Sequence, residues 1–175
     1  MLTDEQSAAV SPICKTILVI FAALVFGPLF FAIIVLFIRF SDEQPAIVNS
    51  LDIIAIIGLG MAFLCALFSF IVPRIVLKQN VLKTARTFFG DEIKGAEAAK
   101  GLAETFQSST IIRLALLEGA IFANLMFFMI QGSIFNLVAA AVLLMIMLLA
   151  IPLPARTMSK VESMFEEAKF LQKTV

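Results

Sequence analysis

The order of apolar and polar residues divides the chain into four long apolar segments separated by shorter polar ones. The apolar segments run over residues 17–38, 53–72, 111–130 and 134–153. A helix that crosses a bilayer needs roughly 20 mostly apolar residues, so each segment is long enough to span or nearly so. The pattern predicts an all-α integral membrane protein, with residues 1–175 forming one four-helix bundle.

Composition supports a membrane protein and removes several function classes. The chain is 61% hydrophobic and 15% charged, with a mean hydropathy of +1.05. A soluble domain is about 45–50% apolar and about 25% charged. This excess excludes a water-soluble monomer, and it excludes a disordered chain, which would be poor in apolar residues. The sequence contains no His, which removes imidazole catalysis and most designs of metal site.

The distribution of Lys and Arg predicts the orientation. With four spans, both termini and the loop over residues 78–109 lie on the same side of the bilayer. Of the thirteen basic residues, all except Arg39 fall on that side. Cytoplasmic segments carry an excess of Lys and Arg, so we expect both termini to be cytoplasmic, in a bacterial inner membrane. Acidic residues balance the basic ones in the loop, which gives no argument for nucleic-acid binding.

Two polar segments, the loop over residues 78–109 and the tail over residues 159–173, have amphipathic helical patterns. The apolar faces consist of Leu82, Ala85 and Phe89, of Ala99, Leu102 and Phe106, and of Val161, Met164, Phe165, Ala168 and Leu171. Ser159 and Glu162 have the spacing of a capping box, which predicts a helix start at Ser159. Basic residues beside these faces predict contact with the anionic inner leaflet. Docking of a cytoplasmic protein on the faces is the alternative.

Small residues recur at a helical spacing within the apolar segments. The stripes are Gly58, Ala62 and Ala66, then Ala115, Gly119 and Ala123, and Ala23 with Gly27. In lipid, helices associate where small residues let the backbones approach, so the stripes predict helix packing. Contacts between protomers of a homo-oligomer are an alternative use. Pro28 predicts a kink in the first helix, because it leaves the Leu24 carbonyl without its usual donor.

The two helical hairpins resemble each other, which suggests a tandem repeat. Residues 20–30 align with residues 112–122, and Val72-Pro73-Arg74 aligns with Leu153-Pro154-Ala155-Arg156. Each hairpin would then end in a Pro–Arg element at the cytoplasmic boundary. If the repeat is real, the two halves are related by an axis along the membrane normal.

Glu118 is the residue with the most chemical promise, because it stands inside the third apolar segment. A charged carboxylate there costs on the order of 3 kcal/mol or more, so it indicates a function by default. One interpretation is an ion pair with Arg74, Arg113 or Arg156, which would hold the helices together. The other is binding of a proton or a cation. Two polar residues inside the spans, Ser69 and Asn124, are candidates to share that site.

The sequence around Glu118, Ala115-Leu116-Leu117-Glu118-Gly119-Ala120-Ile121-Phe122, resembles the carboxylate-bearing helix of the rotor proteolipid, subunit c, of rotary ATP synthases. The resemblance implies that Glu118 exchanges a proton or a sodium ion. In that family the acid stands on the second helix of a hairpin, whereas Glu118 stands on the first of its pair. The whole chain also resembles small four-span bacterial inner-membrane proteins of unknown function.

These observations favour a multi-pass membrane protein without enzymatic activity, cofactor or metal. The spans contain no cluster of carboxylates and no nucleophile beside a base. We expect a structural or accessory membrane component. The alternatives are a proton or cation carrier that uses Glu118, and a membrane anchor that docks a cytoplasmic protein through the middle loop.

Overall fold

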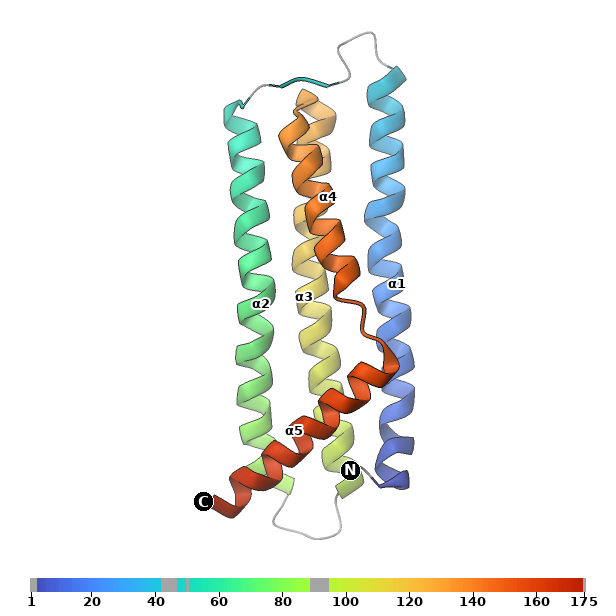
Figure 1. The fold of residues 1–175 in the computed structure, drawn as a ribbon, viewed down its shortest axis with the longest axis vertical. Coiled ribbons are helices and arrows are strands. Elements are labelled where there is room, and N and C mark those ends of the chain that lie inside the picture. Colours follow the sequence, from blue (N-terminus) through green and yellow to red (C-terminus); the bar gives the residue numbers. More distant parts are fainter. Residues whose placement is uncertain (1–2, 42–46, 50, 89–94, 175) are drawn as a thin grey trace. The chain divides into compact units, whose positions relative to one another are not determined.

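Five helices make up the structure, a computed structural model that describes residues 3–41, 47–49, 51–88 and 95–174. They are α1 (Asp4–Ser41), α2 (Ile53–Phe88), α3 (Gly95–Gln131), α4 (Ile134–Leu149) and α5 (Pro154–Thr174), shown in Figure 1. The fold is therefore all-α, as predicted. Within the described part, α1, α2 and α3 are long and apolar enough to cross a membrane. There are up to four spans if α4 and α5, which are separated by a bend, count as one.

Three of the four apolar segments lie inside helices that extend well beyond them. The segments 17–38, 53–72 and 111–130 occupy parts of α1, α2 and α3. The predicted loop over 78–109 consists largely of the end of α2 and the start of α3; its residues 89–94 lie outside the described residues. Of the predicted amphipathic faces, Phe89 and the side chains of Ala85 and Leu171 lie outside as well.

The fourth span is shorter than predicted. Helix α4 ends at Leu149, not at residue 153, and α5 begins at Pro154 rather than at Ser159. Pro152 and Pro154 explain both differences. A proline lacks the N–H that would continue α4 and disfavours helical backbone in the residue before it. At the first helical position, in contrast, its fixed φ is favourable, so Pro154 starts α5 before Ser159 can cap it.

Pro154 also distinguishes the two halves of the suggested repeat. Pro73 lies inside the continuous helix α2, whereas its counterpart Pro154 begins a new helix. In a membrane helix a single proline is tolerated, because the freed backbone group finds another partner. The two Pro–Arg elements are therefore different in conformation, and the tandem repeat stays a prediction. Helix α1 likewise continues through Gly27 and Pro28 without a break in its helical assignment (Figure 1).

The chain divides into two compact units, and α1, α2 and α3 each contribute to both. Unit 1 contains Met1–Phe21, Ile71–Ile112 and Pro152–Val175, and unit 2 contains Ala22–Phe70 and Arg113–Ile151. Residues far apart in the sequence therefore build each unit. The polar loop and tail fall in unit 1, and most of the apolar segments fall in unit 2.

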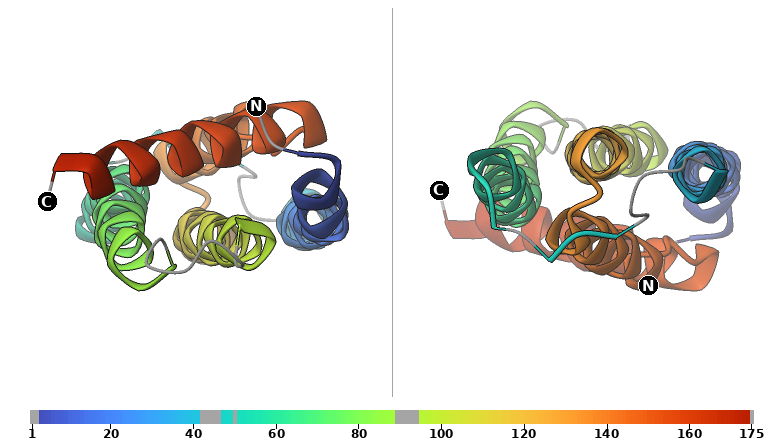
Figure 2. Two further views of the ribbon diagram at one scale, coloured as in Figure 1. Left: turned by 90° about the horizontal axis from the view of Figure 1, so that it is seen from below. Right: turned by 90° about the horizontal axis from the view of Figure 1, so that it is seen from above.

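Unit 1 has a hydrophobic core that includes the apolar face of α5. Its buried members come from α1, α2, α3 and α5: Val10, Cys14, Val81, Ala98, Ala99, Leu102, Ala103, Val161, Met164, Phe165 and Ala168. Figure 2 (left) shows α5 lying across the parts of the other helices that belong to this unit. Val161, Met164, Phe165 and Ala168 of the tail and Ala99 and Leu102 of the loop thus pack inside the protein, which corrects the prediction that they rest on lipid. A partner protein cannot reach these buried side chains either.

Unit 2 buries one face of each helix and exposes large apolar side chains on the others. Phe26, Phe37, Ile53, Phe63 and Leu149 are all more than two-thirds exposed. A soluble monomer rarely exposes so much contiguous apolar surface. In hydrocarbon such side chains cost nothing, because lipid tails are as apolar as they are.

A short segment, residues 47–49, lies across the end of unit 2 where α3 is followed by α4. The Val48 N–H donates to the Gly132 carbonyl (2.8 Å), and the Ile134 N–H donates to the Val48 carbonyl (3.1 Å). Figure 2 (right) shows the segment crossing this end. Gly132 has a φ of 72°, and a β-carbon there would collide with the Arg39 guanidinium. Arg39 is therefore seated against the α3–α4 turn, 5% exposed.

Candidate ion site around Glu118

The Glu118 carboxyl lies in unit 2, partly buried, between α3 and α1. A β-carbon built on Gly27 of α1 would lie 3.2 Å from Glu118 Oε1 and 3.7 Å from Phe122 Cζ. Phe122 in turn packs on Phe31, with ring centroids 5.1 Å apart. The absence of a side chain at Gly27 thus lets the carboxyl approach the α1 backbone beside an aromatic pair.

Pro28 leaves one backbone acceptor of α1 without its usual helical donor. This proline, which is buried, cannot donate to the Leu24 carbonyl four residues earlier. The Leu24 carbonyl belongs to the helical turn before Gly27, the residue that the Glu118 carboxyl approaches. The carboxyl and the carbonyl are both oxygen ligands of the kind that bind a proton or a hard cation.

The structure does not show the ion pairs expected for Glu118. Among the described residues, Glu118 makes no hydrogen bond and no ion pair. Arg113 instead stacks over the Phe70 ring, 4.7 Å from its centroid. Arg74 and Arg156 are exposed and belong to unit 1. The interpretation of Glu118 as a structural ion pair therefore loses its main support.

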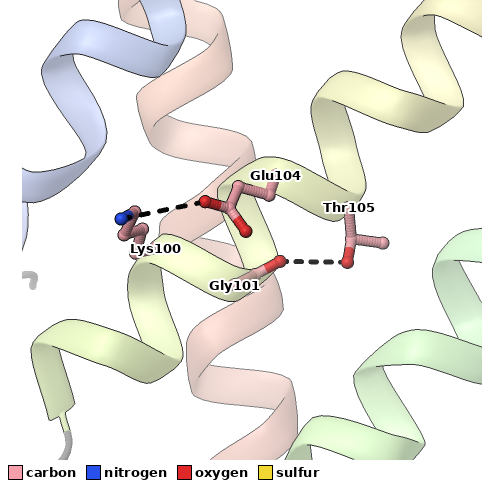
Figure 3. Close-up of polar contacts among 4 residues, drawn as sticks. All are labelled: Lys100, Gly101, Glu104 and Thr105. Carbon is pink, nitrogen blue, oxygen red and sulfur yellow. Dashed lines mark hydrogen bonds and ion pairs between the residues drawn. The ribbon is translucent and has the colours of Figure 1, made fainter.

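Two ion pairs, one within α3 and one within α5, lie at the surface. Lys100 Nζ lies 4.0 Å from Glu104 Oε1, and Thr105 Oγ1 donates to the Gly101 carbonyl (3.0 Å). Figure 3 shows both contacts. Lys169 and Glu166 form a similar pair at 3.8 Å. Both pairs are exposed, and such pairs contribute little to stability. Glu104 is thus a solvated counterpart of Glu118 on the same helix.

Ser69 and Asn124 do not join Glu118. The Ser69 hydroxyl donates to the Ala66 carbonyl of its own helix (2.7 Å). Asn124 follows Glu118 by six residues, which turns its side chain by about 120° around the α3 axis. Its Nδ2 donates to the Ala120 carbonyl (2.9 Å), and its Oδ1 faces Gly58 of α2. The two polar groups of α3 therefore serve different neighbours.

Sequence reasoning missed Asn136, which lies with Asn124 against Gly58. A β-carbon on Gly58 would clash with Asn136 Oδ1 and would lie 2.9 Å from Asn124 Oδ1. Both asparagines are 0% exposed. The sequence carried a signal, since Asn136 is a carboxamide inside an apolar segment. The partner helix could not be read from the sequence.

The three stripes of small residues differ in how far they are buried within the chain. Gly58 and Ala62 of α2 are buried and Ala66 is partly buried. Ala23, Ala115 and Gly119 are exposed, and a β-carbon on Gly119 would meet no atom within 4 Å. Ala123 is partly buried. Of the three stripes, the α2 stripe packs within the chain, whereas most of the α3 stripe does not. A contact between protomers through the α3 stripe stays a prediction.

Comparison with known proteins gives no further guide to function. No protein family model, no curated protein and no solved structure matches the chain. In the described part of the sequence, no three His, Cys, Asp or Glu side chains are grouped so as to hold a metal ion. What the protein does must therefore be inferred from its own side chains.

Proposed function

We propose that this chain is a multi-pass membrane protein whose Glu118 carboxyl binds and releases a proton or a small cation. The observation that carries the proposal is the contact of the Glu118 carboxyl with Gly27, without an ion pair among the described residues. A bare carboxylate in hydrocarbon is costly, so it is stable there when it carries a proton or holds a cation. The freed Leu24 carbonyl is a second ligand for either species.

The other two interpretations receive less support. A structural ion pair requires an arginine partner, which Glu118 does not have in the described residues. Docking of a cytoplasmic protein through the middle loop requires exposed apolar residues. Leu82 is 40% exposed, but Ala98, Ala99, Leu102 and Ala103 are buried in the core of unit 1. A structural or accessory role without ion binding remains the alternative that the experiment below must separate.

We also propose the orientation and the location. Every basic residue except Arg39 lies on the side of the termini and of the 78–109 loop, which favours a cytoplasmic position for both termini. A bacterial inner membrane fits this assignment. Glu118 then lies on the third span, five residues after Arg113, nearer to the cytoplasmic side.

Reconstitution of the purified protein into liposomes tests the function. With a pH-sensitive dye inside, an imposed pH gradient should dissipate faster than in protein-free vesicles, and Glu118→Gln should abolish the difference. A second set, in which the gradient is of sodium at constant pH, distinguishes a cation from a proton. Glu104→Gln is the matched control, because it removes an exposed carboxylate from the same helix.

Two results contradict the proposal. If the wild-type protein conducts no faster than empty vesicles in either set, the chain is an accessory component. If Glu118→Gln conducts as fast as the wild type, the flux does not depend on Glu118.

A further inference from the structure

A polar cluster in unit 2, separate from the site around Glu118, joins α2, α3 and α4. It consists of the Asn124 and Asn136 carboxamides and the side-chain-free face of Gly58, which we name the carboxamide cluster. All three residues lie inside the apolar segments, and all three are buried. Along their helices they lie within about 11 Å of Gln131, Ile134 and Ile53, where those helices start or end.

The hydrogen-bonding groups of the cluster are incompletely used within the chain. Asn124 Oδ1 and both polar atoms of Asn136 are buried without a hydrogen-bond partner, whereas Asn124 Nδ2 is paired with Ala120. Native proteins pair nearly all such groups, and hydrocarbon offers no water from outside to do so. Two acceptor oxygens and one donor group therefore remain to be satisfied at one place.

The two acceptor oxygens and the donor Nδ2 indicate which kind of molecule would satisfy them. A cation would be held by the two oxygens but would leave the Asn136 amide N–H groups unpaired, and neutral ligands would not offset its charge. A water molecule donates to both oxygens and accepts from Asn136 Nδ2. Three polar partners are what a buried water typically has.

We infer that the carboxamide cluster is a binding site for a single neutral protic molecule, water, which links α3 to α4 beside Gly58 of α2. Gly58 is required because a methyl group at this position would occupy the space of the two oxygens. Gly60, two residues further on, is the natural comparison, since a β-carbon there meets no atom within 4 Å. The inference is independent of the proposed function, because Glu118 takes no part in the cluster.

Proton-detected solid-state NMR in lipid bilayers tests the site directly. Magnetisation should pass from water to the Asn136 side-chain amide, identified by its loss in Asn136→Leu, as readily as to the exposed Gln79 amide. The backbone amide of Phe128, 0% exposed on α3, serves as the dry reference. The transfer to Asn136 should vanish in Gly58→Ala and persist in Gly60→Ala. The wild-type measurement stands even where a variant fails to fold.

Two outcomes overturn the inference. An Asn136 amide as dry as the Phe128 amide would mean that the two carboxamides bond to each other. A melting temperature that rises with sodium chloride but not with choline chloride, and no longer does so in Asn124→Leu, would identify a cation site. Flux through Glu118 is not measured in either arm, so failure here leaves the proposed function to its own test.

Discussion

Gly27 of α1 and the Glu118 carboxyl of α3 are packed against each other. A β-carbon built on Gly27 would lie only 3.2 Å from Glu118 Oε1, which is closer than ordinary van der Waals contact. The carboxyl thus lies beside the α1 backbone next to Pro28. Substitutions at Gly27 should therefore alter the site while Glu118 itself stays unchanged.

Gly27→Ala and Gly119→Ala form a matched pair. Each replaces a helical glycine by alanine, which by itself stabilises a helix by up to about 1 kcal/mol. At Gly119 the new methyl meets no atom within 4 Å, so the gain should be realised. At Gly27 the methyl presses on Glu118, and we expect this variant to be about 1 kcal/mol less stable than Gly119→Ala. Denaturant unfolding in detergent measures the difference; equal stabilities would contradict the packing.

A hydrophobic carbodiimide should modify Glu118. Carbodiimides react with protonated carboxyls, and hydrocarbon favours the neutral form of an unpaired acid. The yield should rise as the pH falls, and mass spectrometry should locate the adduct on the peptide that contains Glu118. If the bound species is sodium, added sodium should protect. The adduct should disappear in Glu118→Gln and remain in Glu104→Gln; modification of Glu104 in place of Glu118 would refute the prediction.

Phe165→Ala should destabilise the protein strongly, by about 3–5 kcal/mol, because the ring is 2% exposed in the core of unit 1. Phe170, five residues later on α5, is 70% exposed. Phe170→Ala should change the free energy of unfolding by no more than about 0.5 kcal/mol. Thermal unfolding in detergent measures both. Similar losses for the two variants would mean that α5 rests on lipid, as its sequence pattern suggested.

Gly132→Ala should destabilise the α3–α4 turn for two separable reasons. Its φ of 72° costs an L-residue roughly 1–2 kcal/mol, and the β-carbon would collide with the Arg39 guanidinium. Asparagine tolerates the backbone conformation better than alanine but carries the same β-carbon. Gly132→Asn should therefore recover part of the loss, and Gly132→Ala combined with Arg39→Ala should recover another part. Stability unchanged in Gly132→Ala would contradict the described turn.

Single cysteines test the orientation. In a background of Cys14→Ser and Cys65→Ser, Glu104→Cys and Asn49→Cys place thiols at exposed positions in the predicted cytoplasmic loop and in the 47–49 segment. In intact cells a membrane-impermeant maleimide should label Asn49→Cys and spare Glu104→Cys. In inverted vesicles the labelling should be reversed, so that Glu104→Cys reacts and Asn49→Cys does not. Labelling of both from one side would contradict the four-span topology.

Sequence patterns located the helices well, because a long apolar segment has one solution in hydrocarbon, a helix with all its backbone groups paired. They failed where local and tertiary preferences compete. The apolar face of α5 looked like a lipid-binding face, since its pattern is the same whether lipid or protein covers it. Only the fold shows that Val161, Phe165 and Ala168 cover one another with residues from α1 and α3.

The candidate site was half predictable. Glu118 stood out because a carboxylate in an apolar segment is costly, and that reasoning needs no structure. Its neighbour Gly27 was noted only as a packing residue, and the position of Asn136 and Asn124 against Gly58 could not be foreseen. Which face of one helix meets which face of another depends on side-chain fit over the whole bundle, information that no single segment contains.

The composition of unit 1 has a consequence for biogenesis. Its core is closed by α5, so Val10 and Cys14 meet Phe165 and Ala168 only after α2, α3 and α4 have been synthesised. Until then the apolar patch on the early helices stays uncovered, where chaperones or proteases can reach it. A ribosome stalled before residue 154 should hold a nascent chain that is inserted in the bilayer yet sensitive to protease at the helix ends that belong to unit 1.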